Sequence, residues 1–191
     1  ILLLFIICMV AAATRLIPYE MVNFTAIGAL AFMGGAMIEN KWLRYILPIG
    51  LLAITDLVLN TVVHSEFTGG SFFYEGMLWV YIPFILSVAL GRIILKEASA
   101  GKVIFAGLVS GIVFFLLSNF GVWMSGTMYP KTGGGLLEAY YMGLPFFRNT
   151  LLGNIVYGLA IYFTFVFVAK KSTKTGLSPL MIDPNVSLFD I

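Results

Sequence analysis

The sequence predicts an all-α integral membrane protein, a bundle of six transmembrane helices, and three observations lead to this fold class. Apolar and aromatic residues make up 60% of the 191 residues, and the mean hydropathy is +1.00. Charged residues make up only 10%, whereas a soluble domain is usually about a quarter charged. The apolar residues stand in continuous runs, not in the alternating pattern of a lipid-facing β-barrel. This composition excludes a water-soluble enzyme, a nucleic-acid-binding protein and a disordered chain.

Each expected span is an apolar run near the length of about 20 residues that a membrane helix needs. The first run is short, and the second is short and rich in small residues, while the other four have close to the full length. In chain order the runs cover residues 1–13, 25–38, 42–60, 77–95, 103–119 and 150–169. Residues 1–171 are therefore predicted to form a six-helix transmembrane domain, and residues 172–191, with two prolines and little helix pattern, a cytoplasmic C-terminal tail.

Basic residues are concentrated in alternate connections and in the tail. Eight of the eleven Lys and Arg residues lie there, and the positive-inside rule places them in the cytoplasm. These eight are Lys41, Arg44, Arg92, Lys96, Lys102, Lys170, Lys171 and Lys174. Because six is an even number of spans, both termini are expected on the cytoplasmic side as well. We therefore expect a multi-pass protein of a bacterial inner (plasma) membrane.

The connections on the opposite side are longer, and the last two contain glycine clusters. They comprise residues 15–24, 61–76 and 121–149. A loop as long as the last of these is uncommon unless it is a lid or a binding loop. We therefore expect residues 121–149 to close over a site on the outer face.

Polar side chains of four predicted spans reach the same depth, the outer third of the bundle. Asn23 and Thr25 open the second span, and Asp56 lies in the last turns of the third. Asn119 ends the fifth span, and Arg148 immediately precedes the sixth. Polar groups inside a bilayer are costly and usually mark function or pair with one another. We expect these residues to line a ligand pocket that is open to the outside and has mostly apolar walls.

Structural explanations exist for the same signals. Outer Trp and Tyr side chains could form an aromatic belt at headgroup level, and polar residues could cap helix ends. Asp56 could bind a ligand or form a buried ion pair with Arg148 or Arg15. Small residues four positions apart let helices approach closely, either within this bundle or against a partner protein. These pairs are Ala31 and Gly35, Ser87 and Gly91, and Gly107 and Gly111.

Motifs for catalysis and metal binding are missing from the sequence. It contains no P-loop and no H-E-x-x-H motif, and its one histidine, His64, cannot by itself form a zinc site. The single cysteine, Cys8, excludes an internal disulfide. We therefore expect a protein that is not an enzyme and uses no cofactor or metal. A weaker alternative is a membrane enzyme in which desolvated Asp56 acts as a base on a lipid-soluble substrate.

Several stretches together resemble a family of uncharacterised bacterial six-helix membrane proteins. The stretches are Arg15–Pro18, Asn23–Thr25, Gly34–Gly35, Asp56, Ser118–Trp123, Tyr129–Pro130 and Leu144–Arg148. That family is similar in turn to the S (substrate-binding) components of energy-coupling factor (ECF) transporters. S components bind vitamins or metal ions near the outer face and associate with a membrane coupling protein and two ATPases.

The resemblance implies that the outer polar residues form the substrate site. The residues implied are Asn23, Thr25, Asp56, Asn119, Trp123, Tyr129 and Arg148. Asn and Asp side chains would orient the ligand by hydrogen bonds, and Tyr129 would belong to the lid. Trp123 would stack on the ligand, and Arg148 would meet an acid group or pair with Asp56.

Two functions of different classes follow from the sequence. The first is a membrane-embedded substrate-binding subunit of an ECF-type transporter for a small organic nutrient such as a vitamin, with membrane lipid, a coupling protein and ATPases as partners. The alternative is a structural or accessory subunit of a larger membrane complex with no ligand of its own. The small-residue pairs and the long tail motivate this alternative.

Overall fold

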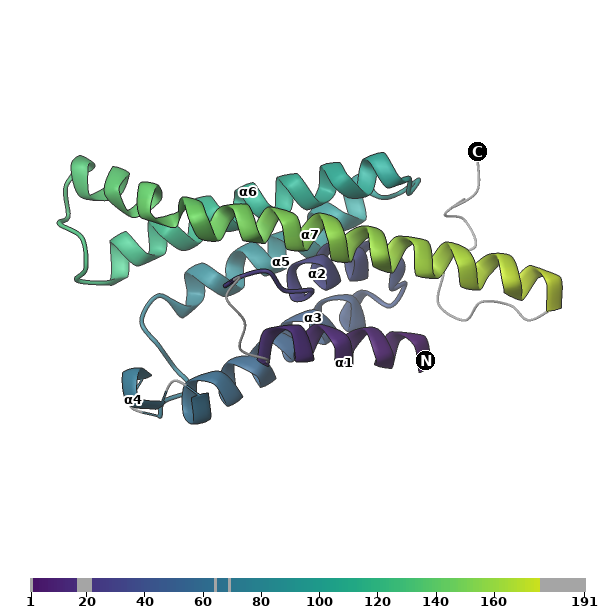
Figure 1. Cartoon of the computed structure of the whole chain (residues 1–191), viewed down its shortest axis with the longest axis horizontal. Coiled ribbons are helices and arrows are strands. Elements are labelled where there is room, and N and C mark those ends of the chain that lie inside the picture. The colour runs from purple at the N-terminus through teal and green to yellow at the C-terminus, as the bar shows by residue number, and fades with distance from the viewer. Residues whose placement is uncertain (1, 17–21, 64, 69, 176–191) are drawn as a thin grey trace.

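The computed structural model describes residues 2–16, 22–63, 65–68 and 70–175, and all regular elements in these ranges are helices (Figure 1). Six of them are α1 (Leu2–Leu16), α2 (Ile27–Met37), α3 (Lys41–Val58), α5 (Met77–Ile94), α6 (Ala100–Ser125) and α7 (Gly133–Thr175). A π-helical segment, Leu59–Val63, continues α3, and a single turn, α4 (Ser65–Thr68), follows it. The all-α fold class is confirmed for the described part of the chain.

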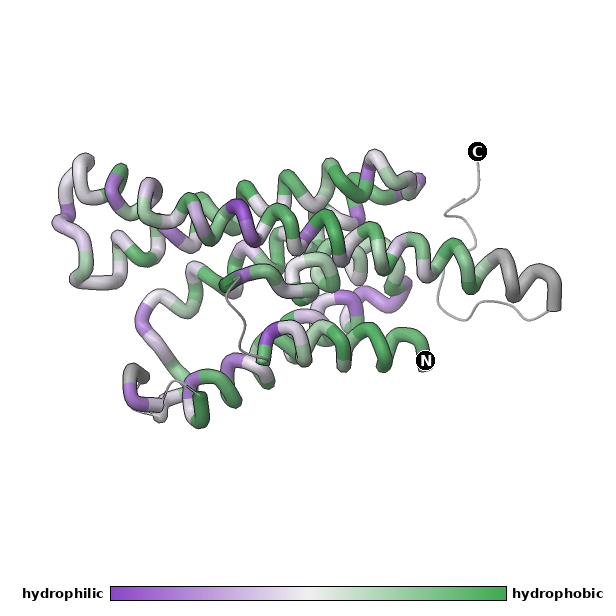
Figure 2. The backbone as a smooth tube through the Cα atoms, in the orientation of Figure 1, coloured by the Kyte–Doolittle hydropathy of each residue, from purple (hydrophilic) through white to green (hydrophobic). Residues whose placement is uncertain are grey.

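Four helical segments are long and apolar enough to cross a membrane. They are Lys41–Val63, Met77–Ile94, Ala100–Ser125 and Gly133–Ala169. Hydrophobic residues follow these helices along most of their length (Figure 2). The other two expected spans are the shorter apolar helices α1 and α2. With 11 residues, α2 has a length of only about 16 Å at 1.5 Å per residue, about half of the hydrocarbon core.

Local sequence signals explain where two of the long helices begin. The Asn40 side chain accepts hydrogen bonds from the backbone N–H groups of Trp42 and Leu43, at 2.9 and 3.1 Å, and so caps α3. Ser99 caps α6 in the same way by accepting from the backbone N–H of Lys102 at 3.3 Å. Such caps satisfy backbone donors that have no partner within the helix.

The short helix α2 lies at the centre of the bundle and contacts α1, α3, α5, α6 and α7. Nine of its eleven residues are buried. A Cβ atom on Gly35 would collide with the backbone of Val88, and one on Gly91 would collide with the backbone of Phe32. The backbones of α2 and α5 are therefore in direct contact. The small-residue pairs of these two helices pack within the bundle, not against a partner.

The expectation of a long outer loop over residues 121–149 is wrong. Helix α6 continues to Ser125 and α7 begins at Gly133, so only residues 126–132 connect the two. The glycine cluster Gly133–Gly135 forms the first turn of α7. Residues that follow it, such as Leu136 and Ala139, favour a helix. Helices α6 and α7 pack closely along each other (Figure 1), and this packing stabilises the additional turns.

Helix α7 is also longer at its other end than the sequence suggested. It has 43 residues, or about 65 Å at 1.5 Å per residue, and so contains both the expected sixth span and residues 172–175 of the expected tail. The remainder of that tail, residues 176–191, lies outside the described residues. Pro145 is accommodated inside α7.

Candidate functional site

Asp56 is the buried centre of a polar group, which we call the Asp56 quartet: Asp56 with the half-buried Arg15, Tyr74 and Tyr81. Asp56 is 2% exposed, and its Oδ1 atom forms an ion pair with Nη2 of Arg15. Its Oδ2 atom accepts hydrogen bonds from the hydroxyls of Tyr81, at 2.9 Å, and Tyr74, at 3.3 Å. The expected buried ion pair is therefore confirmed with Arg15, whereas the other candidate partner, Arg148, is exposed on α7.

The Asp56 quartet joins four separate segments. Arg15 lies at the end of α1, Asp56 in the last turn of α3, Tyr81 in the second turn of α5, and Tyr74 in the segment before α5. Burial, and after it the nearby carboxylate of Asp56, raises the pKa of Tyr74, so its phenol remains a protonated donor at neutral pH. The charges of Arg15 and Asp56 offset each other. The quartet thus has no net charge and links α1, α3 and α5 to one another.

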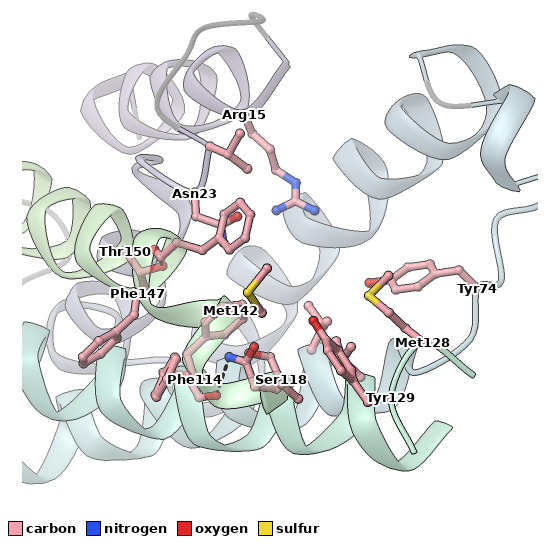
Figure 3. A pocket seen from close by; sticks show the side chains of 18 residues that line it. Arg15, Asn23, Tyr74, Phe114, Ser118, Met128, Tyr129, Met142, Phe147 and Thr150 are labelled. Carbon is pink, nitrogen blue, oxygen red and sulfur yellow. Dashed lines mark hydrogen bonds between the residues drawn. The ribbon is translucent and has the colours of Figure 1, made fainter. Parts of the chain in front are cut away.

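A cavity of about 430 Å³ lies beside the quartet (Figure 3). Its walls are mostly apolar, and the guanidinium of Arg15 points into it (Figure 3). The polar residues that line it are Arg15, Asn23, Tyr74, Ser118, Asn119, Tyr129 and Thr150. The apolar residues include Phe114, Phe115, Met128, Met142, Phe146 and Phe147. This volume and this mixture of apolar walls with a few polar groups are typical of a small-molecule site.

Two asparagines are held at this cavity by the backbone around them. Asn23 has a positive φ of 68°, a conformation that Asn adopts more readily than most residues. The preceding carbonyl, of Val22, accepts a hydrogen bond from Asn149 of α7 at 2.9 Å. Asn119 donates to the carbonyl of Phe115 at 2.9 Å.

A second hollow, of about 40 Å³, adjoins the main cavity toward the middle of the bundle. The two share Arg15, Asn23, Phe114 and Thr150 as lining residues. The residues that line only the smaller hollow are Thr25, Ile27, Gly28, Phe84, Ser87, Ser110 and Asn154. Side chains of α2, α5, α6 and α7 thus surround a space in which most of the polar groups are hydroxyls.

The main cavity continues into a third hollow beneath the connection between α6 and α7. This hollow has a volume of about 460 Å³ and shares Tyr74, Ser118 and Met128 with the main cavity, among other residues. Thr127 and Gly126 of the connection also line it. Although short, this connection lies at the position where a longer lid was expected.

Four of the seven residues expected at the substrate site line these cavities. Asn23, Asn119 and Tyr129 line the main cavity, and Thr25 lines the smaller hollow. Asp56 lines none of the described hollows but holds two residues that do, Arg15 and Tyr74. The convergence of polar residues from separate spans is therefore present in the structure.

Trp123 and Arg148 are placed differently from the expectation. The indole N–H of Trp123 donates to the carbonyl of Pro130 at 2.9 Å, and Lys131 donates to the carbonyl of Trp123. Trp123 thus fastens the connection between α6 and α7 and lines none of the described hollows. Arg148 lines none of them either and is exposed.

Sequence reasoning did not identify Tyr81 or Ser110. Tyr81 lies in an apolar span and resembled an ordinary core aromatic, and no local pattern links it to Asp56, 25 positions earlier. Ser110 lies next to Gly111, and this context suggested helix packing alone. Among the residues that the structure describes, no three His, Cys, Asp or Glu side chains come together as metal ligands would.

Residues 1–176 of the chain match DUF6580, a family of unknown function, so the chain belongs to that family. No curated protein and no solved structure matches the chain.

Proposed function

We propose that this DUF6580 protein is a membrane-embedded substrate-binding subunit for the uptake of a small organic nutrient, similar in role to the S component of an ECF transporter. The main cavity is the observation that carries the proposal. Its volume of about 430 Å³ lies in the usual range for small-molecule sites, roughly 300–1,000 Å³. Its walls come from several helices and combine phenylalanines with a few polar side chains.

The distribution of charge supports an outward-facing cavity. Lys41, Arg44 and Lys102 lie at the starts of α3 and α6, and Arg92 lies at the end of α5. The opposite ends of α5 and α6 line the main cavity, with Val80, Ser118 and Val122, and the opposite end of α3 carries Asp56, which pairs with the lining residue Arg15. The positive-inside rule then places the basic end in the cytoplasm and the mouth of the cavity outside. We propose six membrane segments with both termini cytoplasmic, in a bacterial inner membrane.

The Asp56 quartet favours binding over catalysis. A general base must lie within hydrogen-bond reach of the substrate proton, but Asp56 lines none of the described hollows, and its oxygens already accept bonds from Arg15, Tyr74 and Tyr81. We therefore propose that the protein is not an enzyme. Energy for uptake would come from partners, namely a membrane coupling protein and ATPases.

The alternative function, an accessory subunit with no ligand, has lost part of its support. The small-residue pairs that motivated it are used within the bundle: Gly35 and Gly91 bring α2 and α5 together, and Gly107 and Gly111 face Asn154 and Leu151 of α7. The cavity has no role in that alternative.

The test is binding of a vitamin panel to the purified protein in lipid nanodiscs, measured by native mass spectrometry and calorimetry. Ser118→Trp places a large side chain in the main cavity, and Leu116→Trp places the same side chain at a 46% exposed position on the same helix. We expect a panel member to bind the wild type and Leu116→Trp, and Ser118→Trp to lose binding. Absence of binding by the whole panel, together with stoichiometric purification with an assembly that lacks ATPases, would favour the accessory role.

A further inference from the structure

The charge and hydrogen-bonding groups of the two adjoining cavities restrict the class of ligand. We infer that the ligand is an uncharged molecule with an aromatic or apolar body in the main cavity and a small hydrogen-bonding head, such as a carboxamide, in the hollow that contains Ser110. This inference rests on the proposed function and names the substrate class of the same site.

Ser110 is the observation that points to a ligand in the smaller hollow. It is 2% exposed, it lines the hollow, and its hydroxyl oxygen has no hydrogen-bond partner within the described part of the chain. A buried hydroxyl without a partner destabilises a protein. The hollow has room for a group of a few atoms, about 40 Å³, which could supply the missing bond.

Neighbouring hydroxyls in the hollow contrast with Ser110. Ser87 donates to the carbonyl of Pro83 at 2.8 Å, and Thr150 donates to the carbonyl of Phe146 at 3.0 Å. Each hydroxyl therefore already donates its one hydrogen bond within its own helix and can only accept further bonds. Ser110 can still donate. The buried Nε–H of Arg15, which also lines the hollow, has no partner among the described residues either. The hollow therefore offers donors as well as acceptors, which matches a group that both donates and accepts, as a carboxamide does.

The net charge around the two cavities excludes a strongly charged head. Arg15 is the one charged residue among those that line the main cavity and the smaller hollow, and its charge is offset by its ion pair with Asp56. A carboxylate head would place a second negative charge near buried Asp56, and an ammonium head would approach the guanidinium of Arg15. Either charge would be desolvated without an unpaired countercharge, which is costly.

The main cavity has the walls that an aromatic body needs. Phe115 and Phe147 stack with a centroid distance of 4.5 Å, so part of the wall is already ordered before a ligand binds. Met128 and Met142 also line the cavity, and methionine adapts well to flat aromatic surfaces. Preorganised apolar walls of this kind favour binding because little additional ordering is required.

The test uses three probes that share an indole body and differ in the head: indole-3-acetamide, indole-3-acetate and tryptamine. Calorimetry on the protein in nanodiscs at pH 7, with empty nanodiscs as the blank, is expected to show at least tenfold tighter binding of the amide. Ser110→Ala is expected to weaken amide binding about tenfold, which corresponds to one lost hydrogen bond. Its thermal unfolding midpoint should stay unchanged or rise, because the unpartnered hydroxyl is removed.

Thr164→Val is the matched control, since it removes an exposed hydroxyl on α7 that bonds to the carbonyl of Ala160. It should leave amide affinity unchanged. Tighter binding of the acid or the amine would overturn the neutral-ligand inference, and unchanged amide affinity in Ser110→Ala would overturn the placement of the head. If no indole probe binds while a vitamin of the panel does, this inference fails and the proposed function stands. If the panel also fails to bind, the proposed function itself is wrong.

Discussion

Removal of Arg15 is the most informative perturbation of the Asp56 quartet. In Arg15→Ala the carboxylate of Asp56, whose side chain is 3% exposed, would keep only the two tyrosine hydroxyls as partners. Leaving one member of a buried ion pair uncompensated costs about 3–5 kcal/mol. Asp56→Asn should cost less, about 1–3 kcal/mol, because the Arg15 side chain is 20% exposed and its guanidinium can be hydrated from the cavity.

The double variant Arg15→Met/Asp56→Leu tests the same reasoning by removing both charges of the ion pair together. With both charges replaced by apolar groups, no buried charge is left unpaired, so the double variant should be more stable than Arg15→Ala alone. Unfolding by SDS in mixed micelles, followed by circular dichroism, would measure these free energies. Arg148→Ala removes an exposed arginine and should change stability by no more than about 0.5 kcal/mol. Equal costs for Arg15→Ala and Asp56→Asn, or a double variant no more stable than Arg15→Ala, would refute the argument.

Three further predictions concern packing, the connection between α6 and α7, and pH. Gly35→Ala should destabilise the protein by about 1–3 kcal/mol in the same SDS assay, because the new Cβ atom would collide with the backbone of Val88. Gly50→Ala should be tolerated, because no atom lies near the new Cβ atom. Trp123→Phe should leave ligand affinity measured by calorimetry unchanged but increase proteolysis of the connection, since the bond to Pro130 at 2.9 Å is lost. In a difference titration at 295 nm against Tyr74→Phe, Tyr74 should remain protonated at pH 10, because its pKa is raised in the native state. A raised native pKa means that the unfolded state ionises first, so the contribution of Tyr74 to stability is complete below about pH 10 and declines as the pH rises further.

Hydropathy alone was sufficient to predict the six main helices and their order, because a continuous apolar run in lipid must satisfy its backbone within a helix. It failed for residues 133–149. That segment begins with three glycines and contains Pro145, both of which usually interrupt helices. Its helical state depends on packing against α6, and this tertiary contact cannot be read from local composition.

For the candidate site too, the positions of some residues could be predicted from the sequence and those of others could not. The depth of Asn23, Thr25 and Asn119 along their spans could be counted from the sequence, and these residues line the cavities. The roles of Trp123 and Arg148 depend on the direction in which each side chain leaves its helix, and an error in the extent of the helix changes that direction. The sequence predicts a loop over residues 121–149, and in such a loop both side chains are expected over the cavity.

The packing of α2 also determines on which side the cavity can open. At the end of the bundle near the basic residues, Gly35 and Gly91 bring the backbones of α2 and α5 into contact, so no space remains for a ligand between these two helices. Toward the opposite end, Gly28 of α2 and Phe84 and Ser87 of α5 line the smaller hollow. A ligand in these cavities therefore has no path between α2 and α5 toward the basic end unless their closely packed backbones separate. Under the proposed function, release into the cytoplasm thus favours a movement of the whole bundle by its partners over the opening of a channel within it.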